Sequence, residues 1–105
     1  MKRVKRRYLA LQLDSVGVPG GKEFMDAIWG AVSRLYGEYG ASLTSLLLID
    51  YDVEKKRAVI RTNLAAVDTV RTSVASITSI INVQAAVHVV TVSGTLKSLH
   101  QKIDR

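Results

Sequence analysis

Residues 85–103 read A-A-V-H-V-V-T-V-S-G-T-L-K-S-L-H-Q-K-I and set the architecture of the rest of the chain. The first half is a nearly unbroken run of apolar and β-branched residues, which by itself predicts a strand buried on both faces. Ser93-Gly94-Thr95 then predicts the start of a short helix with one apolar stripe, made of Leu96, Leu99 and Ile103. Free N–H groups at such a start favour an anion, and Lys97 lies in the first turn. The turn is therefore either a phosphate site or simple helix capping.

Length and composition favour one folded domain. The chain has 105 residues, of which 48% are hydrophobic, and this excludes a disordered chain. It has no cysteine, which excludes disulfides, thiolate metal sites and thiol nucleophiles. No apolar run approaches the roughly 18 residues of a membrane span, and the one after the basic start is too short for a signal peptide. We therefore expect a cytoplasmic protein that does not contact membranes.

The positive charge is concentrated at the two ends of the chain. The net charge is +6, yet residues 1–7 alone contain five bases and no acid, while residues 8–96 are close to neutral. Residues 97–105 are again basic. This pattern predicts a basic tail over 1–7 and a single domain over 8–105. Such blocks are typical of interaction with a polyanion, the alternative being a tail that only aids solubility.

The first half of the chain predicts a strand and a long helix. Residues 8–13 alternate, with Leu9, Leu11 and Leu13 on one face, as in a half-buried strand. A loop rich in glycine and proline follows over 16–21. Apolar residues at helical spacing then predict a helix over 22–36, and Gly37 is suited to its C-terminal end.

The second half predicts a hairpin, a second helix and a last strand. Residues 46–52 and 57–62 are the hairpin strands, and Arg57, Val59 and Arg61 share one face of the second. Asn63 is a suitable N-cap for a long helix that closes at Asn82. Its apolar stripe contains Val67, Val70, Val74, Ile77 and Ile81.

The element order β-α-β-β-α-β-α predicts an α+β fold of the ferredoxin-like, RRM-like type. This split βαββαβ arrangement has a four-stranded antiparallel sheet with two helices on one face, here followed by an extra C-terminal helix. The expected strand order, 4-1-3-2, places the last strand at an edge. Its apolar faces then need cover from the last helix or from a partner protein. The residues expected to bind such a partner are Val87, Val89, Leu96, Leu99 and Ile103.

Nothing in the sequence predicts a catalytic site or a metal site. His88 and His100 do not have the spacing of metal ligands. Alternating Asp50, Asp52 and Glu54 could hold magnesium, although their position at a hairpin start explains them more simply. The loop Gly20-Gly21-Lys22 resembles the anion cradle of small acyl-phosphate-cleaving enzymes of this fold, but the arginine of that cradle is missing. We therefore assign no catalytic residue, no metal ligand and no cofactor.

Nucleic-acid binding through phosphate contacts is the better-supported interpretation. RNA-recognition domains stack bases on aromatic residues of the two central strands. Here the third strand has no aromatic residue and the first offers only Tyr8. Phosphate contacts position a protein without reading sequence. The expected RNA-contacting residues are Lys2, Arg3, Lys5, Arg6, Arg7, Arg57, Arg61, Lys97 and Lys102, although Arg57 and Arg61 could instead pair with Asp50 or Asp52 across the strands.

A series of short motifs resembles a known family over residues 7–103. In this order and spacing the sequence is similar to protein component 2 of archaeal ribonuclease P, the Pop-five type related to the Rpp-fourteen proteins. Two departures are the glycine-rich loop over 16–22, where relatives are more charged, and a short C-terminus. The motifs are Arg7-Tyr8, Ala27-Ile28-Trp29, Gly37-x-x-Gly40, Tyr51-Asp52, Arg61, Arg71, Val92-Ser-Gly-Thr-Leu-Lys97 and Leu99.

This resemblance implies a non-catalytic subunit of the ribonucleoprotein that removes the 5′ leader from precursor tRNA. In that family the RNA is the catalyst and uses bound magnesium, and precursor tRNA is met indirectly. The expected partners are the ribonuclease P RNA and protein component 3, the Rpp-thirty type, with pairs assembling as a heterotetramer. The alternative is a protein-interaction or ligand-sensing module of the same fold without an RNA function.

Overall fold

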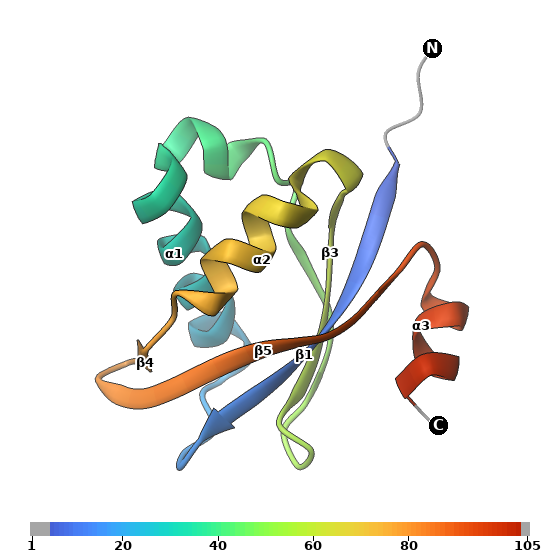
Figure 1. The fold of residues 1–105 in the computed structure, drawn as a ribbon. Helices are drawn as coiled ribbons and strands as arrows, with labels where there is room; N and C mark the ends of the chain where they lie inside the picture. The colour runs from blue at the N-terminus through green and yellow to red at the C-terminus, as the bar shows by residue number, and fades with distance from the viewer. Residues whose placement is uncertain (1–4, 104–105) are drawn as a thin grey trace.

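The computed structural model describes residues 5–103. Within these residues it has five strands, three α-helices and a 3₁₀ turn (Figure 1). These elements are β1 (Arg6–Ser15), α1 (Gly21–Ser42), β2 (Leu47–Asp52), β3 (Arg57–Asn63), the 3₁₀ turn (Leu64–Ala66), α2 (Val67–Ala75), β4 (Ser79–Ile80), β5 (Val83–Ser93) and α3 (Leu96–Ile103). No helix within residues 5–103 is long and apolar enough to cross a membrane.

The strands form one curled antiparallel sheet in the order β2-β3-β1-β5-β4. The predicted α+β architecture and the predicted arrangement of four strands are confirmed, with β1 and β3 inside the sheet. The predicted strand number is wrong, because the two-residue strand β4 pairs with the start of β5. Beyond that short pairing, β5 is an edge strand as expected.

The fifth strand arises where the sequence pattern predicted the second half of a helix. Helix α2 ends at Ala75, so Ile77 and Ile81 do not continue its stripe. At this end the hydroxyl of Ser76 donates a hydrogen bond to the carbonyl of Ser73 (2.6 Å). Four of the five residues 77–81 are β-branched and fit an extended backbone better than a helix. The chain therefore extends and turns back at Ile81 and Asn82.

Helix α1 is longer than predicted because it resumes after its glycine. Gly37 adopts φ 79° and ψ 169°, a conformation that is open to glycine and interrupts the helix. The chain then continues in helical conformation to Ser42. The side chain of Tyr36 packs against Gly40, where a Cβ atom would lie only 2.8 Å from the Cβ of Tyr36.

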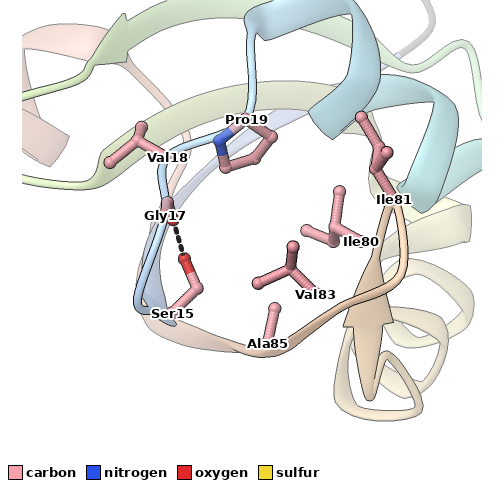
Figure 2. Close-up of a pocket in the computed structure, with 8 residues that line it drawn as sticks. All are labelled: Ser15, Gly17, Val18, Pro19, Ile80, Ile81, Val83 and Ala85. Carbon is pink, nitrogen blue, oxygen red and sulfur yellow. Dashed lines mark hydrogen bonds between the residues drawn. The ribbon is translucent and has the colours of Figure 1, made fainter.

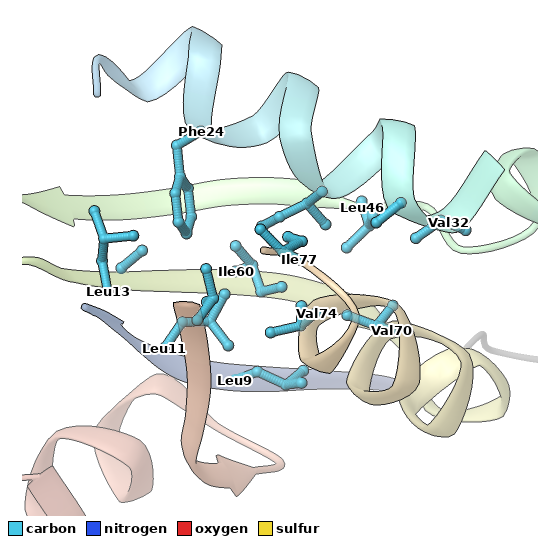
Figure 3. Packing of buried hydrophobic residues seen from close by; sticks show 14 of the residues in the cluster. Leu9, Leu11, Leu13, Phe24, Val32, Leu46, Ile60, Val70, Val74 and Ile77 are labelled. Carbon is cyan, nitrogen blue, oxygen red and sulfur yellow. The ribbon is translucent and has the colours of Figure 1, made fainter. Parts of the chain in front are cut away.

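The main core lies between the sheet and helices α1 and α2. The inward side chains of β1 are fully or almost fully buried there, as their alternation predicted (Figure 3). Phe24 of α1 joins this core, and its ring stacks on Tyr51 with a centroid separation of 5.3 Å. The principal buried residues are Leu9, Leu11, Leu13, Phe24, Ile28, Val32, Ile60, Val70 and Val74.

Helix α3 forms a third layer on the opposite face of the sheet (Figure 1). Leu99 is fully buried against Ala10 of β1 and Val59 of β3. Helix α3 therefore covers the middle of the sheet face that carries Arg57 and Arg61. Two buried faces in one small sheet explain why β1 and β3 have apolar residues at both alternating positions.

Candidate functional site

Basic side chains gather at the end of the sheet where β1 begins. Tyr8 of β1 lies between Arg61 of β3 and Ser93 of β5 in the strand register, and Arg6 pairs with Asn63. Strand alternation places Arg6 and Arg61 on the same face as Tyr8, which packs beside helix α3. Lys5, Arg6 and Lys97 are exposed, while Arg7 and Arg61 are half-buried. We call Lys5, Arg6, Arg7, Arg61 and Lys97 the basic edge.

Arg7 connects the N-terminal segment to the turn before α3. One guanidinium nitrogen, Nη1, donates a hydrogen bond to the carbonyl of Arg6 (2.9 Å). The same guanidinium lies over Gly94, where an added Cβ atom would be 3.5 Å from Nη1. Arg7 and Gly94, which are 87 positions apart in the chain, are therefore in contact, and the positive charge of Arg7 lies at the turn before α3. No pattern in the sequence predicts this contact, because it depends on how the ends of β1 and β5 meet.

The turn before α3 is a capping structure. The hydroxyl of Thr95 accepts a hydrogen bond from the N–H of Ser98 (3.1 Å), and the carbonyl of Thr95 accepts one from the N–H of Leu99 (3.1 Å). The capping interpretation is thus confirmed. Thr95 already accepts hydrogen bonds from these N–H groups, and phosphate binding at the helix start stays a prediction. Lys97, in the first turn of α3, is exposed and adds a positive charge to the surface there.

Among the other predicted RNA-contacting residues that the structure describes, Arg57 lies apart from the basic edge, whereas the side chain of Lys102 reaches the same end of β5. Arg57 is at the opposite end of β3, where its Nε donates to Oε1 of Gln12 (3.5 Å). Lys102 lies on α3 and its ammonium group donates to the carbonyl of Val92 on β5 (3.1 Å). Lys2 and Arg3 lie outside the described residues. Of the seven expected contacts that the structure describes, five therefore form the basic edge, Lys102 reaches the same end of the sheet, and Arg57 lies at the other end.

The acidic residues of the β2–β3 hairpin have local roles. The Asp50 carboxylate accepts from the N–H of Tyr51 (2.9 Å), and the Asp52 carboxylate accepts from the N–H of Lys55 (3.1 Å). These contacts support the turn interpretation. Within residues 5–103 no three His, Cys, Asp or Glu residues are grouped closely enough to hold a metal ion. His88 and His100 are both exposed, on β5 and α3.

The residues expected to bind a partner are mostly used inside the chain. Val87 is 4% exposed in the main core and Val89 packs against that core, below helices α1 and α2. Leu99 is buried on the other face of the sheet, with Leu96 and Ile103 packed beside it. Helix α3 thus does not cover the apolar face of β5, because the two groups lie on opposite sides of the sheet. Outside the core, Val90 of β5 remains half exposed.

Tyr51 fixes the loop between β1 and α1. Its hydroxyl donates a hydrogen bond to the carbonyl of Pro19 (2.6 Å), and its ring stacks on Phe24. Burial, followed by the nearby negative charge of Glu23, raises the pKa of the Tyr51 phenol. Tyr51 therefore has a structural role at the end of the sheet away from the basic edge.

The sequence profile of the Rpp14/Pop5 family matches residues 7–104, which is nearly the whole chain. The chain belongs to this family. Most motifs that carried the resemblance now have a place in the fold. Gly37 interrupts α1 and Gly40 receives Tyr36. Tyr51 holds the β1–α1 loop, and Ser93-Gly94-Thr95 joins Arg7 to the cap of α3.

Relatives of this Rpp14/Pop5 chain include archaeal proteins named ribonuclease P protein component 2. The protein of Pyrococcus furiosus is 33% identical over 100 residues, which cover 95% of this chain and 83% of the relative. The protein of Methanobrevibacter smithii is 29% identical over 110 residues, covering 98% of this chain and 92% of the relative. A chain in a cryo-EM structure of yeast ribonuclease MRP has the same fold, with a TM-score of 0.69 at 18% identity, covering 99% of this chain and 95% of that one.

Proposed function

We propose that this Rpp14/Pop5 chain is a non-catalytic protein subunit of ribonuclease P, the ribonucleoprotein that removes the 5′ leader from precursor tRNA. In this proposal the RNA performs the cleavage with its own bound magnesium, and the protein holds no cofactor. The protein acts in the cytoplasm and meets precursor tRNA only through the assembled particle. The observation that carries the proposal is family membership over residues 7–104, together with the basic edge.

The proposed mechanism is electrostatic stabilisation of the folded RNA. The basic edge presents five cationic side chains at one end of the sheet, from β1 and the residue before it, from β3 and from α3. Tyr8, the aromatic residue at its centre, packs against the Leu99 cluster and is only partly exposed, which argues against base stacking on the sheet face. Phosphate contact without base readout suits a protein that supports an RNA fold.

The rigid placement of these charges supports the mechanism. Arg61 is on a central strand, Arg7 lies against Gly94, and Lys97 is on a helix whose N-terminus is capped. Cations fixed by the fold lose less conformational freedom when they meet phosphates than cations on a flexible tail.

The proposal includes a second protein subunit, protein component 3 of the Rpp-thirty type. Two such pairs are expected to form a heterotetramer. Several large apolar side chains lie on the surface and not in the core, among them Val16, Tyr39 and Ile81, and this supports the binding of a partner protein.

Reconstitution of precursor-tRNA cleavage tests this function. Catalytic RNA and component 3 are combined with and without this chain at limiting magnesium, and the initial cleavage rate is measured. We expect the chain to raise the rate and to lower the magnesium concentration that is needed. An unchanged rate at every magnesium concentration, with RNA and component 3 both competent in a parallel control, would reject the assignment in favour of an RNA-independent interaction module.

A further inference from the structure

Strand β5 has an open edge next to helix α2. On its inner side β5 pairs with β1, and on its outer side it pairs with β4 only at its start. The N–H of Ala85 donates to the carbonyl of Thr78 on that outer side (3.0 Å). Main-chain groups of a strand alternate between its two sides, so those of Val87 and Val89 also point outward. Within residues 5–103 no strand pairs with these two valines there, and we call their outward N–H and C=O groups the open edge.

The open edge is bounded at both ends. Toward β4, the β4–β5 hairpin closes over an apolar hollow that faces the β1–α1 loop (Figure 2). Toward α3, the register between β1 and β5 shifts and leaves Val90 as a bulge residue without a partner in β1. The carbonyl of Val92 then accepts a hydrogen bond from the ammonium group of Lys102 (3.1 Å). The main chain is thus open over the short stretch between the hairpin and the bulge.

A groove of about 360 Å³ lies beside the open edge, between β5 and α2. Helix α2 contributes Arg71, Val74 and Ala75 to its lining, and β5 contributes Val87, His88 and Val89. The two side chains at positions 74 and 87 are buried, whereas those at 71 and 88 are exposed. An open strand edge on one wall and a helix on the other fit an extended peptide, which adds a strand to the sheet.

The segment that contains the open edge has no device against strand pairing. Edge strands of natural proteins are commonly protected by charged side chains or proline. Residues 73–96 contain no Asp, Glu, Lys, Arg or Pro. The β-branched residues of β5 also favour an extended neighbour. This edge is therefore suited to pairing with another strand.

The charges around the groove favour an acidic partner. Among the described lining residues are Arg71 and His88, which is cationic when protonated, and no carboxylate. Arg34 of α1, whose guanidinium contacts the end of α2, adds a positive charge nearby. Two exposed acids border the groove without lining it, Asp68 one turn before Arg71 on α2 and Asp14 in the neighbouring hollow. A carboxylate inside the groove would therefore meet Arg71 first.

We propose that an extended acidic segment of another protein binds in this groove and adds a strand to the open edge. Its main chain pairs with Val87 and Val89, and one of its carboxylates faces Arg71. An RNA strand suits the groove less, because phosphate oxygens only accept hydrogen bonds and leave the two valine carbonyls without donors. The groove shares no residue with the basic edge, so this binding is separate from the proposed contact with RNA.

Peptide binding followed by amide hydrogen exchange tests this site. The probe is a capped peptide of about eight alternating threonine and valine residues with one central aspartate. With excess peptide, exchange of the Val87 and Val89 amides, measured by NMR, should slow by at least about tenfold. The same peptide N-methylated throughout has no main-chain donors and should not bind.

Charge reversal tests the role of Arg71. By fluorescence anisotropy, wild type should bind the aspartate peptide more tightly than a peptide with lysine in its place, and Arg71→Glu should reverse this order. Arg71 is exposed, so the thermal midpoint of the variant should stay close to wild type. The matched control Lys22→Glu makes the same charge reversal at an exposed position of α1 outside the groove and should leave the order unchanged.

Several outcomes would overturn the proposal. Unchanged exchange of the Val87 and Val89 amides with excess peptide would exclude strand addition, as would equal binding of the N-methylated peptide. An unchanged preference for aspartate in Arg71→Glu would refute the acidic partner. Concentration-dependent protection of the same amides in wild type alone would assign the open edge to a second copy of the chain. Single-stranded RNA that displaces the peptide from wild type, and binds Arg71→Glu more weakly, would assign the groove to RNA.

Discussion

Replacing Leu99 by alanine tests whether α3 is a packed third layer that supports the basic edge. Leu99 is fully buried against Ala10 and Val59, and it is the buried residue of α3. Truncation of a buried leucine to alanine costs about 2–5 kcal/mol, depending on how far the site can collapse. We expect about 3 kcal/mol here, because an eight-residue helix at the molecular surface can relax in part.

This loss is large for a small domain. A chain of this size has a total unfolding free energy of about 5–15 kcal/mol, and 1 kcal/mol corresponds to about 4–8 °C in thermal midpoint. Leu99→Ala should therefore lower the midpoint by roughly 12–24 °C in a scan followed by circular dichroism. It should also weaken RNA binding, since α3 carries Lys97.

Leu35→Ala is the matched control for this prediction. Leu35 is 46% exposed on α1, so the same chemical change should alter the unfolding free energy by about 0.5 kcal/mol or less. Equal small losses for both variants would refute the packing of α3 on the sheet. A large loss for Leu35→Ala would instead refute the exposure of the α1 surface.

Three further predictions concern the fold that positions the site. Asn63→Ala removes the cap on the N–H of Ala66 and the bond to the carbonyl of Leu43, so chemical denaturation should show a loss of about 1–2 kcal/mol; no loss would contradict both contacts. Gly37→Ala should cost about 1 kcal/mol because φ is 79°, and an unchanged midpoint would argue against that kink. Tyr51 has a raised pKa in the folded chain, so its unfolded form ionises first and stability should fall above about pH 10. Tyr51→Phe should flatten this alkaline decline in urea titrations between pH 8 and 11, and an equal decline in both proteins would refute the assignment.

The alternating and helical patterns predicted most of the fold because each reflects one strand face or one helix face. The alternation of Leu9, Leu11 and Leu13 identified β1, and Asn63 marked the start of the helical segment. The stripe of Leu96, Leu99 and Ile103 identified α3. These signals are local, so they survive without knowledge of the tertiary structure.

The errors came from residues whose conformation depends on distant neighbours. Ile77 and Ile81 have helical spacing from Val70 and Val74, yet the chain there pairs with β5 instead. Periodicity cannot separate a short buried strand from a helix segment in such an apolar run. The apolar stripe of α3 likewise does not predict which face of the sheet the helix covers, because both faces of β1 and β3 have apolar residues.

The candidate site was predicted in composition but not in arrangement. A high density of bases identified residues 1–7 and 97–105. The sequence could not show that Arg7 lies against Gly94 or that Arg57 is at the far end of β3. No pattern predicts the apolar hollow between the β1–α1 loop and the β4–β5 hairpin, because the spacing of Ile77 and Ile81 predicts a helix there.

The salt dependence of RNA binding tests the central claim most directly. If the basic edge engages about five phosphates, the log–log slope of affinity against salt should be about −3.5 to −4.5. Arg6→Gln, Arg61→Gln and Lys97→Gln together should make it shallower by about 2–3, while Arg57→Gln, at the other end of β3, should change it little. A wild-type slope near zero, or a triple variant with the wild-type slope, would contradict the account.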